Sequence, residues 1–203
     1  MKNKNVTILD YGSGNLLSVK RAFEYCGANV KISNIYKDII SSERLVIPGV
    51  GAFKAGMDSI KSLNLIDPLK QFYSNQRPLL GICLGMQLLS TKSFEFGVND
   101  GLDFISGKVT KITTRSTDNV ELKIPHIGWA KIMFKDTKKE NYYYMCHSYQ
   151  FLPNNFKNIS ATCFYGGHEI VASISHNNII GFQFHPEKSA GPGLKLLDKF
   201  LKI

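Results

Sequence analysis

The sequence predicts an α/β protein with a mostly parallel central sheet, flanking helices and additional antiparallel strands in the C-terminal half. Three observations lead to this fold. The first half of the chain alternates short apolar runs, which are typical of buried strands, with segments of helical periodicity. One of these apolar runs turns directly into a helix between two closely spaced glycines. The second half contains several strand-like segments joined by short polar turns, which favours antiparallel pairing.

In the first half, the predicted elements follow the order β-α-β-β-α-β-α, which implies a mostly parallel sheet with helices on both faces. The first helix has Leu16, Val19, Phe23 and Cys26 near one face. The predicted elements are strand 6–10, helix 15–26, strands 30–33 and 45–47, a helical pattern over 57–73, strand 79–83 and a helix from residue 84.

In the second half, six segments have the pattern of strands and one helix closes the chain. The Gly191-Pro192-Gly193 sequence interrupts the pattern, so we expect the helix to begin after it. The predicted strands are 108–112, 129–134, 142–145, 160–163, 170–175 and 179–183, and the predicted helix is 194–201. Because no repeat or linker divides the sequence, we expect residues 1–203 to form a single domain with a full core.

Composition excludes several classes of protein. The formal net charge is +9, but the basic residues are spread along the chain, so we expect no nucleic-acid partner. A basic partner-facing surface or an anionic ligand explains the charge as well. No apolar stretch is long enough to form a signal peptide or cross a membrane. The cysteines are widely spaced without a C-x-x-C pair, which predicts reduced thiols and a cytoplasmic location.

The most specific motif places Cys83 on a sharp turn between a predicted strand and a helix. Gly81 and Gly85 flank it in the pattern of a nucleophile elbow, with sulfur in place of a serine hydroxyl. Small residues are needed there because a strand that turns directly into a helix crowds its own backbone. The helix N-terminus favours the thiolate, which is the reactive form. Most cysteines are small buried side chains, but the flanking glycines favour a nucleophile here.

A candidate base lies far downstream, at the end of predicted strand 179–183. His185 is followed by Glu187, so the imidazole can take the thiol proton while the carboxylate orients the ring. A histidine alone would be an ordinary core or surface residue, so this interpretation depends on Cys83.

A glycine-rich turn, Pro48-Gly49-Val50-Gly51, offers a candidate oxyanion hole. Backbone N–H groups in such a turn can stabilise the oxygen of a tetrahedral intermediate. The amide of Leu84, directly after the nucleophile, would be the second donor. The simpler interpretation is a tight turn between a strand and a helix.

These motifs resemble a known family. Three segments resemble the class I (triad) glutamine amidotransferases. They are Pro48-Gly49-Val50-Gly51, Gly81-Ile82-Cys83-Leu84-Gly85-Met86-Gln87 and Gln183-Phe184-His185-Pro186-Glu187. Further segments are similar to the glutaminase subunits of imidazole glycerol phosphate synthases, namely Asp10-Tyr11-Gly12-Ser13-Gly14-Asn15-Leu16, Pro125-His126-Ile127-Gly128-Trp129, His147-Ser148-Tyr149 and His185-Pro186-Glu187-Lys188-Ser189. The resemblance covers the whole chain.

The resemblance implies that glutamine is hydrolysed to glutamate and ammonia without a cofactor or metal. The ammonia would pass to a (β/α)8-barrel cyclase subunit in a heterodimer, as a step of histidine biosynthesis. It also implies a role for each matching residue. The triad would be Cys83, His185 and Glu187; the oxyanion hole Val50 and Leu84; the substrate-binding residues Gly51, Gln87, Glu95, His147, Ser148 and Tyr149; and the partner interface Asn15 and Trp129. Glu95 would pair with the α-ammonium group, and the His147-Ser148-Tyr149 segment would act largely through its backbone.

One departure from the family pattern leaves an alternative open. Ala130 follows Trp129 where the family usually has asparagine, and we expect this change to weaken a hydrogen bond to the partner. A closely related glutaminase that supplies a sugar amidotransferase for surface-polysaccharide synthesis is therefore an alternative. A catalytically inactive binding module is less favoured, because the triad is intact. A metal site that includes Cys146 and His147 is also disfavoured, because no standard ligand spacing is present.

Overall fold

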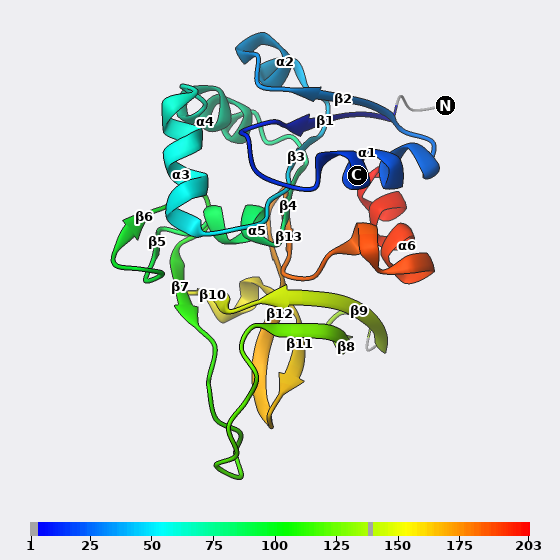
Figure 1. The fold of residues 1–203 in the computed structure, drawn as a ribbon. Coiled ribbons are helices and arrows are strands. Elements are labelled where there is room, and N and C mark those ends of the chain that lie inside the picture. Colours follow the sequence, from blue (N-terminus) through cyan, green and yellow to red (C-terminus); the bar gives the residue numbers. More distant parts are fainter. Residues whose placement is uncertain (1–3, 138–139) are drawn as a thin grey trace.

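The structure, a computed structural model, describes residues 4–137 and 140–203 (Figure 1). Its centre is a nine-stranded sheet in the order β2-β1-β3-β4-β13-β12-β11-β8-β9. These strands are β1 (Asn5–Leu9), β2 (Asn29–Ser33), β3 (Leu45–Ile47), β4 (Leu79–Ile82), β8 (His126–Phe134), β9 (Glu140–His147), β11 (Ile159–Tyr165), β12 (His168–His176) and β13 (Ile179–Phe182). A smaller sheet, in the order β10-β7-β5-β6, contains β5 (Lys92–Ser93), β6 (Asn99–Asp100), β7 (Gly107–Lys111) and β10 (Tyr149–Pro153).

Strand direction changes at β13 in the large sheet. The run β2-β1-β3-β4-β13 is parallel, whereas β12, β11, β8 and β9 continue the sheet in antiparallel pairs. The predicted combination of a parallel part with antiparallel strands in the C-terminal half is confirmed. Because β3, β4 and β13 are parallel neighbours, their carboxyl ends lie at one edge of the sheet, where ligands bind in open α/β sheets.

Helices cover both faces of the parallel part. In Figure 1, α3, α4 and α5 lie on one side of the strands, and α1 and α6 on the other. The helices are α1 (Leu16–Tyr25), α2 (Tyr36–Ser41), α3 (Phe53–Ser62), α4 (Ile66–Ser74), α5 (Leu84–Leu88) and α6 (Ala190–Phe200), with short 3-10 helices η1 (Phe156–Asn158) and η2 (Pro186–Lys188).

Some sequence-based boundaries are wrong. The single helical pattern predicted over 57–73 is two helices, because Asn64 adopts a left-handed φ of 56° after α3 and stops it. The last helix begins at Ala190 rather than Leu194. Pro192 lies in its first turn, where no N–H is required, so it does not interrupt the helix. The elements α2, β5, β6 and β10 have no counterpart among those predicted from the sequence.

Two hydrophobic clusters form the core, one on each face of the sheet. The short strand β3 contributes to both, because Leu45 and Ile47 face one cluster and Val46 faces the other. All three side chains are fully buried. This burial on both faces explains why β3 and β4 are continuous apolar runs rather than alternating ones.

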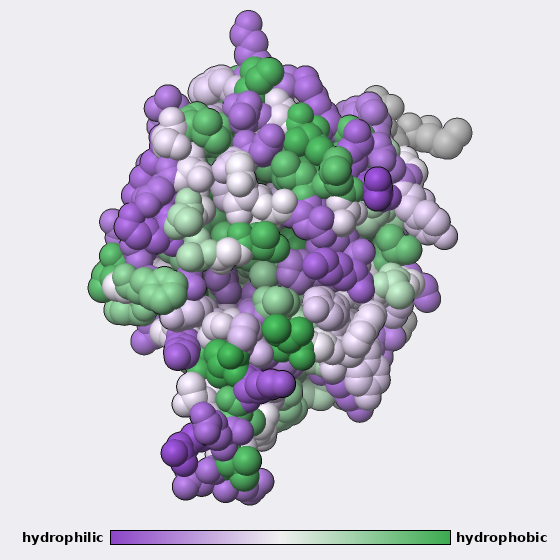
Figure 2. Space-filling view, in the orientation of Figure 1, coloured by the Kyte–Doolittle hydropathy of each residue, from purple (hydrophilic) through white to green (hydrophobic). Residues whose placement is uncertain are grey.

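The surface is mixed in character. Figure 2 shows hydrophilic residues interrupted by small groups of hydrophobic ones, some of them over β8. Among the described residues, no helix combines the length and the apolar character needed to cross a membrane.

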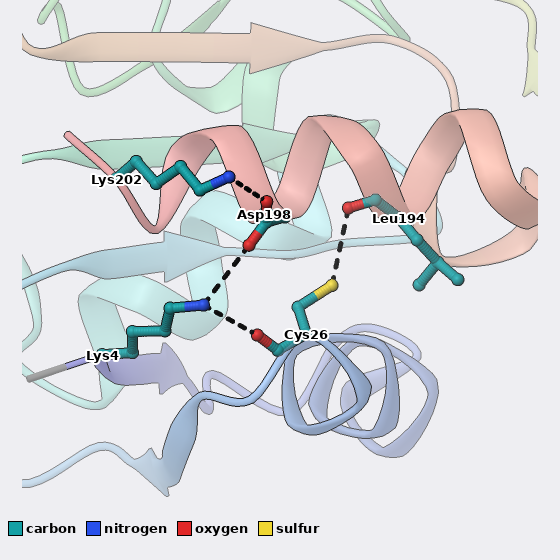
Figure 3. A network of polar contacts seen from close by, with 5 residues as sticks. All are labelled: Lys4, Cys26, Leu194, Asp198 and Lys202. Carbon is teal, nitrogen blue, oxygen red and sulfur yellow. Dashed lines mark hydrogen bonds and ion pairs between the residues drawn. The ribbon is translucent and has the colours of Figure 1, made fainter. Parts of the chain in front are cut away.

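A network of hydrogen bonds and ion pairs connects the C-terminal helix α6 to the rest of the fold (Figure 3). Lys4 Nζ lies 3.3 Å from Asp198 Oδ1 on α6 and donates to the Cys26 carbonyl oxygen at 3.1 Å. The Cys26 thiol donates to the Leu194 carbonyl oxygen, 3.5 Å away. These contacts tie β1, the end of α1 and α6 together. Because α6 directly follows η2, they also hold the segment that carries His185 and Glu187.

Candidate active site

Cys83 occupies a strained turn between β4 and α5. Its φ of 53° lies in the left-handed region, which is costly for a residue with a side chain. The flanking glycines make the turn possible. A Cβ atom at Gly85 would lie 1.8 Å from the Ile47 carbonyl oxygen, and one at Gly81 would lie 2.7 Å from Met86 Cα. The turn therefore has the predicted geometry of a nucleophile elbow, and the Cys83 side chain is almost fully buried (6% exposed).

His185 and Glu187 lie beside this turn, because they follow β13, the parallel neighbour of β4. His185 Nδ1 is 2.8 Å from Glu187 Oε1, and both side chains are buried. The loop is held against β9 at two points. His185 N–H donates to the Tyr144 carbonyl at 2.9 Å, and Ser189 Oγ accepts from Tyr144 N–H at 3.0 Å. Ser189 Oγ also donates to the His185 carbonyl at 2.6 Å, which fixes the backbone of the residue that carries the imidazole.

His185 is protonated at neutral pH, which suits a residue that pairs with a thiolate. Burial alone lowers the pKa of His185, but hydrogen bonds to Cys83 and Glu187 outweigh it and raise this pKa to about 10. At neutral pH the ring therefore carries a proton that it can give to a leaving group. Nδ1 faces the carboxylate, so Nε2 is the nitrogen free to exchange a proton with the sulfur.

The candidate oxyanion hole is occupied by a backbone carbonyl. Leu84 N–H donates to the Gly49 carbonyl oxygen at 3.3 Å, so the Gly49-Val50 peptide presents oxygen rather than N–H to this position. Side chains hold the turn on both sides of that peptide. Tyr11 OH donates to the Pro48 carbonyl and Ser13 Oγ to the Val50 carbonyl, each at 2.6 Å. Rotation of one peptide would convert this arrangement into the predicted pair of donors.

Two of the predicted substrate-binding residues, Gln87 and Glu95, are held by hydrogen bonds to other segments of the chain. Gln87, on α5, donates from Nε2 to the Tyr149 carbonyl oxygen at 2.9 Å. Glu95 is buried, and its Oε2 accepts from Phe53 N–H at 2.6 Å at the start of α3. This contact caps α3 directly after the turn that contains Gly51, so Glu95 and the oxyanion turn are positioned together.

Two backbone carbonyls of the His147-Ser148-Tyr149 segment accept hydrogen bonds within the fold. His147 Nδ1 donates to the Tyr149 carbonyl at 2.9 Å, and the Ser148 carbonyl accepts from Ile112 N–H at 3.0 Å. Burial lowers the pKa of His147 to about 4, so its ring is neutral at physiological pH. His147 therefore supplies no charge to a substrate.

The two predicted interface residues lie on the surface around this site. Asn15 is the N-cap residue of α1, next to the loop whose Ser13 contacts Val50. Trp129, on β8, is 55% exposed and meets Tyr144 edge-to-face, with 6.3 Å between ring centroids. Tyr144 in turn contacts the triad loop through its backbone, as described above.

The expectation that Ala130 weakens a hydrogen bond to the partner is wrong, because the Ala130 side chain does not face the surface. Strand alternation directs its side chain opposite to that of Trp129, and Ala130 is buried in the core (7% exposed). A side chain at this position packs against the interior and does not present a hydrogen-bonding group to a partner. Cys146, by contrast, is exposed, and among the described residues no three potential metal ligands lie together.

Sequence reasoning did not single out two residues that contact the site. Tyr11 is fully buried and holds the Pro48 carbonyl, and Gln183 is fully buried between Cys83 and Gln87. Both lie inside motifs used for the family resemblance. The available signal for Gln183 was a polar residue at the end of an apolar strand.

Comparisons with known proteins show which family the chain resembles. The family model for class-I glutamine amidotransferases matches residues 7–203. An imidazole glycerol phosphate synthase subunit HisH 1 from Legionella pneumophila (strain Paris) is 43% identical over 98% of this chain and 99% of its own length. A HisH subunit from Sulfurimonas denitrificans is 40% identical over 97% of each chain.

Solved structures support the fold at lower sequence identity. A crystal structure of a glutamine amidotransferase superimposes with a TM-score of 0.75 at 15% identity, covering 98% of this chain and 99% of the other. A putative GMP synthase subunit from Thermoplasma acidophilum gives a TM-score of 0.68 at 19% identity, covering 98% and 92%.

Proposed function

This chain belongs to the class I glutamine amidotransferase family and is a glutaminase subunit of the imidazole glycerol phosphate synthase type; we propose that Cys83, His185 and Glu187 perform its chemistry. The observation that carries the proposal is the convergence of three parallel strand ends. β3, β4 and β13 bring the Gly49-Val50 turn, Cys83 and His185 to one edge of the sheet. We propose that residues 1–203 act as one glutamine amidotransferase domain.

In the proposed reaction, the Cys83 thiolate attacks the side-chain amide carbon of glutamine. The protonated His185 gives its proton to the departing ammonia, and a γ-glutamyl thioester remains on the sulfur. Water, deprotonated by His185, then hydrolyses the thioester to glutamate and frees Cys83. Glu187 orients the imidazole and stabilises its charged form, as its 2.8 Å contact with Nδ1 allows.

We assign substrate binding to Glu95, Gln87 and the backbone around Tyr149. Glu95 uses Oε2 to cap α3, and its carboxylate charge suits the α-ammonium group of glutamine. Gln87 and the backbone around Tyr149 supply neutral hydrogen-bonding groups for the rest of the substrate. Leu84 and Val50 N–H groups would stabilise the oxyanion after the Gly49-Val50 peptide rotates.

The ammonia is proposed to pass to a separate cyclase subunit with a (β/α)8 barrel, in a cytoplasmic heterodimer. The surface suited to this partner comprises Asn15, Val50, Ile127 and Trp129, which lie near the site. Val50, Ile127 and Trp129 are 44%, 58% and 55% exposed. The buried position of Ala130 removes the reason that favoured a sugar amidotransferase as the acceptor.

The test compares two nitrogen sources in the complex with the cyclase subunit of the same organism. We expect Cys83→Ala to abolish synthesis of imidazole glycerol phosphate from glutamine but to spare synthesis from ammonium, because the ammonia-using step lies on the partner. Cys146→Ser, which changes an exposed thiol, serves as the matched control and should retain both activities. Glutamine-dependent synthesis that survives in Cys83→Ala would overturn the assignment. Failure of both nitrogen sources in the wild-type complex would favour another acceptor.

A further inference from the structure

Gln183 lies between the candidate nucleophile and the candidate substrate-binding residues. It directly follows β13, two residues before His185, and its side chain is completely buried. Its Nε2 is 3.8 Å from Cys83 Sγ, and its Oε1 is 2.9 Å from Gln87 Nε2. Gln87 Nε2 is also 2.9 Å from the Tyr149 carbonyl oxygen. A continuous chain of hydrogen bonds therefore joins the Tyr149 carbonyl to the Cys83 sulfur.

The contacts of Gln87 determine which end of the Gln183 amide faces the sulfur. A backbone carbonyl can only accept, so the Gln87 atom beside the Tyr149 carbonyl must be the NH₂ group. The second hydrogen of that NH₂ group is directed to Gln183, which must therefore present its oxygen there. Reversing the Gln183 amide would place two NH₂ groups against each other. Its own NH₂ group is consequently directed at Cys83 Sγ.

We propose that Gln183 is a catalytic residue that donates a hydrogen bond to the Cys83 sulfur and increases the fraction of Cys83 present as thiolate. The proposal rests on the proposed role of Cys83 as the nucleophile. A hydrogen bond to an ionised acceptor is stronger than one to its neutral form, so this contact favours loss of the thiol proton. The contribution matters because α5 has only five residues and lacks the field of a long helix.

A second neighbour of the sulfur explains why a fixed donor is needed. The Cys146 carbonyl oxygen lies 3.9 Å from Cys83 Sγ, where it can accept from the neutral thiol. Once the thiol has lost its proton, this carbonyl dipole opposes the negative sulfur. The Gln183 NH₂ group and the protonated His185 then remain as the groups that stabilise it. Cys83 thus has a hydrogen-bonding partner in each protonation state.

A purely structural role for Gln183 makes a different prediction. If Gln183 only links the end of β13 to α5, its loss would lower stability without changing the titration of the sulfur. A matched cross-link exists in Gln150, whose Oε1 accepts from Val171 N–H at 3.1 Å. Gln150→Met therefore controls for the general loss of a strand-linking amide.

The experiment measures the alkylation of Cys83 by iodoacetamide as a function of pH in the full chain, resolved by peptide mass spectrometry. Gln183→Met keeps the size of the side chain and removes the donor. Gln183→Glu keeps the acceptor for Gln87 and places a carboxyl group against the sulfur. Circular dichroism establishes that each variant is folded, and the exposed Cys146 provides an internal reference for the reagent.

We expect the pH midpoint of Cys83 alkylation to rise by about one unit in Gln183→Met, with roughly tenfold slower alkylation below it. Gln183→Glu should raise the midpoint at least as far, and Gln150→Met should leave it unchanged. An unchanged midpoint in either folded Gln183 variant, or an equal rise in Gln150→Met, would overturn the proposal. The assay needs no glutamine, so a wild-type complex with the cyclase that fails to hydrolyse glutamine would contradict the proposed function and leave this result to stand separately.

Discussion

At the scale of single residues, the site depends on positions where no alternative side chain fits. Gly85 and Gly81 permit Cys83 to adopt its left-handed backbone, and the sequence pattern alone identified all three. The same pattern did not reveal Gln183 or Tyr11, because the contacts of a buried amide or phenol depend on segments that are distant in sequence. Buried polar residues are therefore the part of this site that local patterns predict least well.

Gly85→Ala is expected to destabilise the fold strongly. Its Cβ would lie 1.8 Å from the Ile47 carbonyl oxygen, which belongs to a central strand and cannot move freely. We expect a loss of about 3 kcal/mol or more in the free energy of unfolding, measured by urea denaturation. Gly191→Ala is the control, because a Cβ there meets no atom within 4 Å, and it should change stability by less than about 1 kcal/mol. Similar values for both variants would contradict the tight turn.

Because His147 is buried in its neutral form, we expect the folded protein to lose stability in acid. In the unfolded chain a histidine takes up a proton near its ordinary pKa of 6.5, whereas burial keeps His147 neutral until about pH 4. As pH falls from 6.5 to 4, protonation therefore favours the unfolded state, by about 3 kcal/mol at the lower end. His147→Gln should flatten the dependence of unfolding free energy on pH in this window. His168→Gln, at a half-buried position on β12, should preserve the slope of the wild type.

At the scale of elements, prediction succeeded where a continuous apolar run or a helical hydrophobic period was present. The buried strands β3 and β4 and the amphipathic helix α1 were found to within about two residues, the usual boundary error. Strands β5 and β6 have two residues each and carry no measurable period. The division between α3 and α4 depends on one left-handed residue, Asn64, whose conformation an apolar pattern does not encode.

The oxyanion turn predicts conditional activity. In the resting arrangement the Gly49 carbonyl accepts from Leu84 N–H, so the isolated chain should hydrolyse glutamine slowly. Binding of the cyclase and its ligand should favour the rotated peptide and raise the rate at least tenfold, which requires about 1.4 kcal/mol. Ammonia release by the chain alone and by the liganded complex measures this difference. Equal rates would reject the switch. Val50→Pro, which lacks the N–H donor, should stay slow in both states.

At the scale of the whole molecule, one sheet serves two purposes. Its parallel part brings the Gly49-Val50 turn, Cys83 and His185 to adjacent strand ends, and its antiparallel part extends the surface beside them. The alternation of elements predicted the first arrangement. The meeting of β9 with the triad loop could not be predicted, because it joins residues about forty positions apart through backbone atoms, which every residue possesses.

Trp129→Ala is expected to weaken partner binding without affecting the triad. The exposed indole lies on β8 in contact with Tyr144, and large aromatic side chains contribute strongly to protein interfaces. We expect at least a tenfold higher dissociation constant for the cyclase, measured by calorimetry. Phe164→Ala, which removes an aromatic of similar exposure on β11, is the matched control and should bind normally. Unchanged affinity for Trp129→Ala would place the interface elsewhere.

The contacts of Tyr144 also have a consequence for self-association. β9 ends the nine-stranded sheet, and an open edge strand can pair with a second copy of the chain. Here Ser189 and His185 occupy the N–H and C=O groups of Tyr144 that such pairing would use. Ser189→Ala should free that N–H, so light scattering on storage should rise as glutaminase activity falls. The loop that carries His185 thereby covers one position of this open sheet edge.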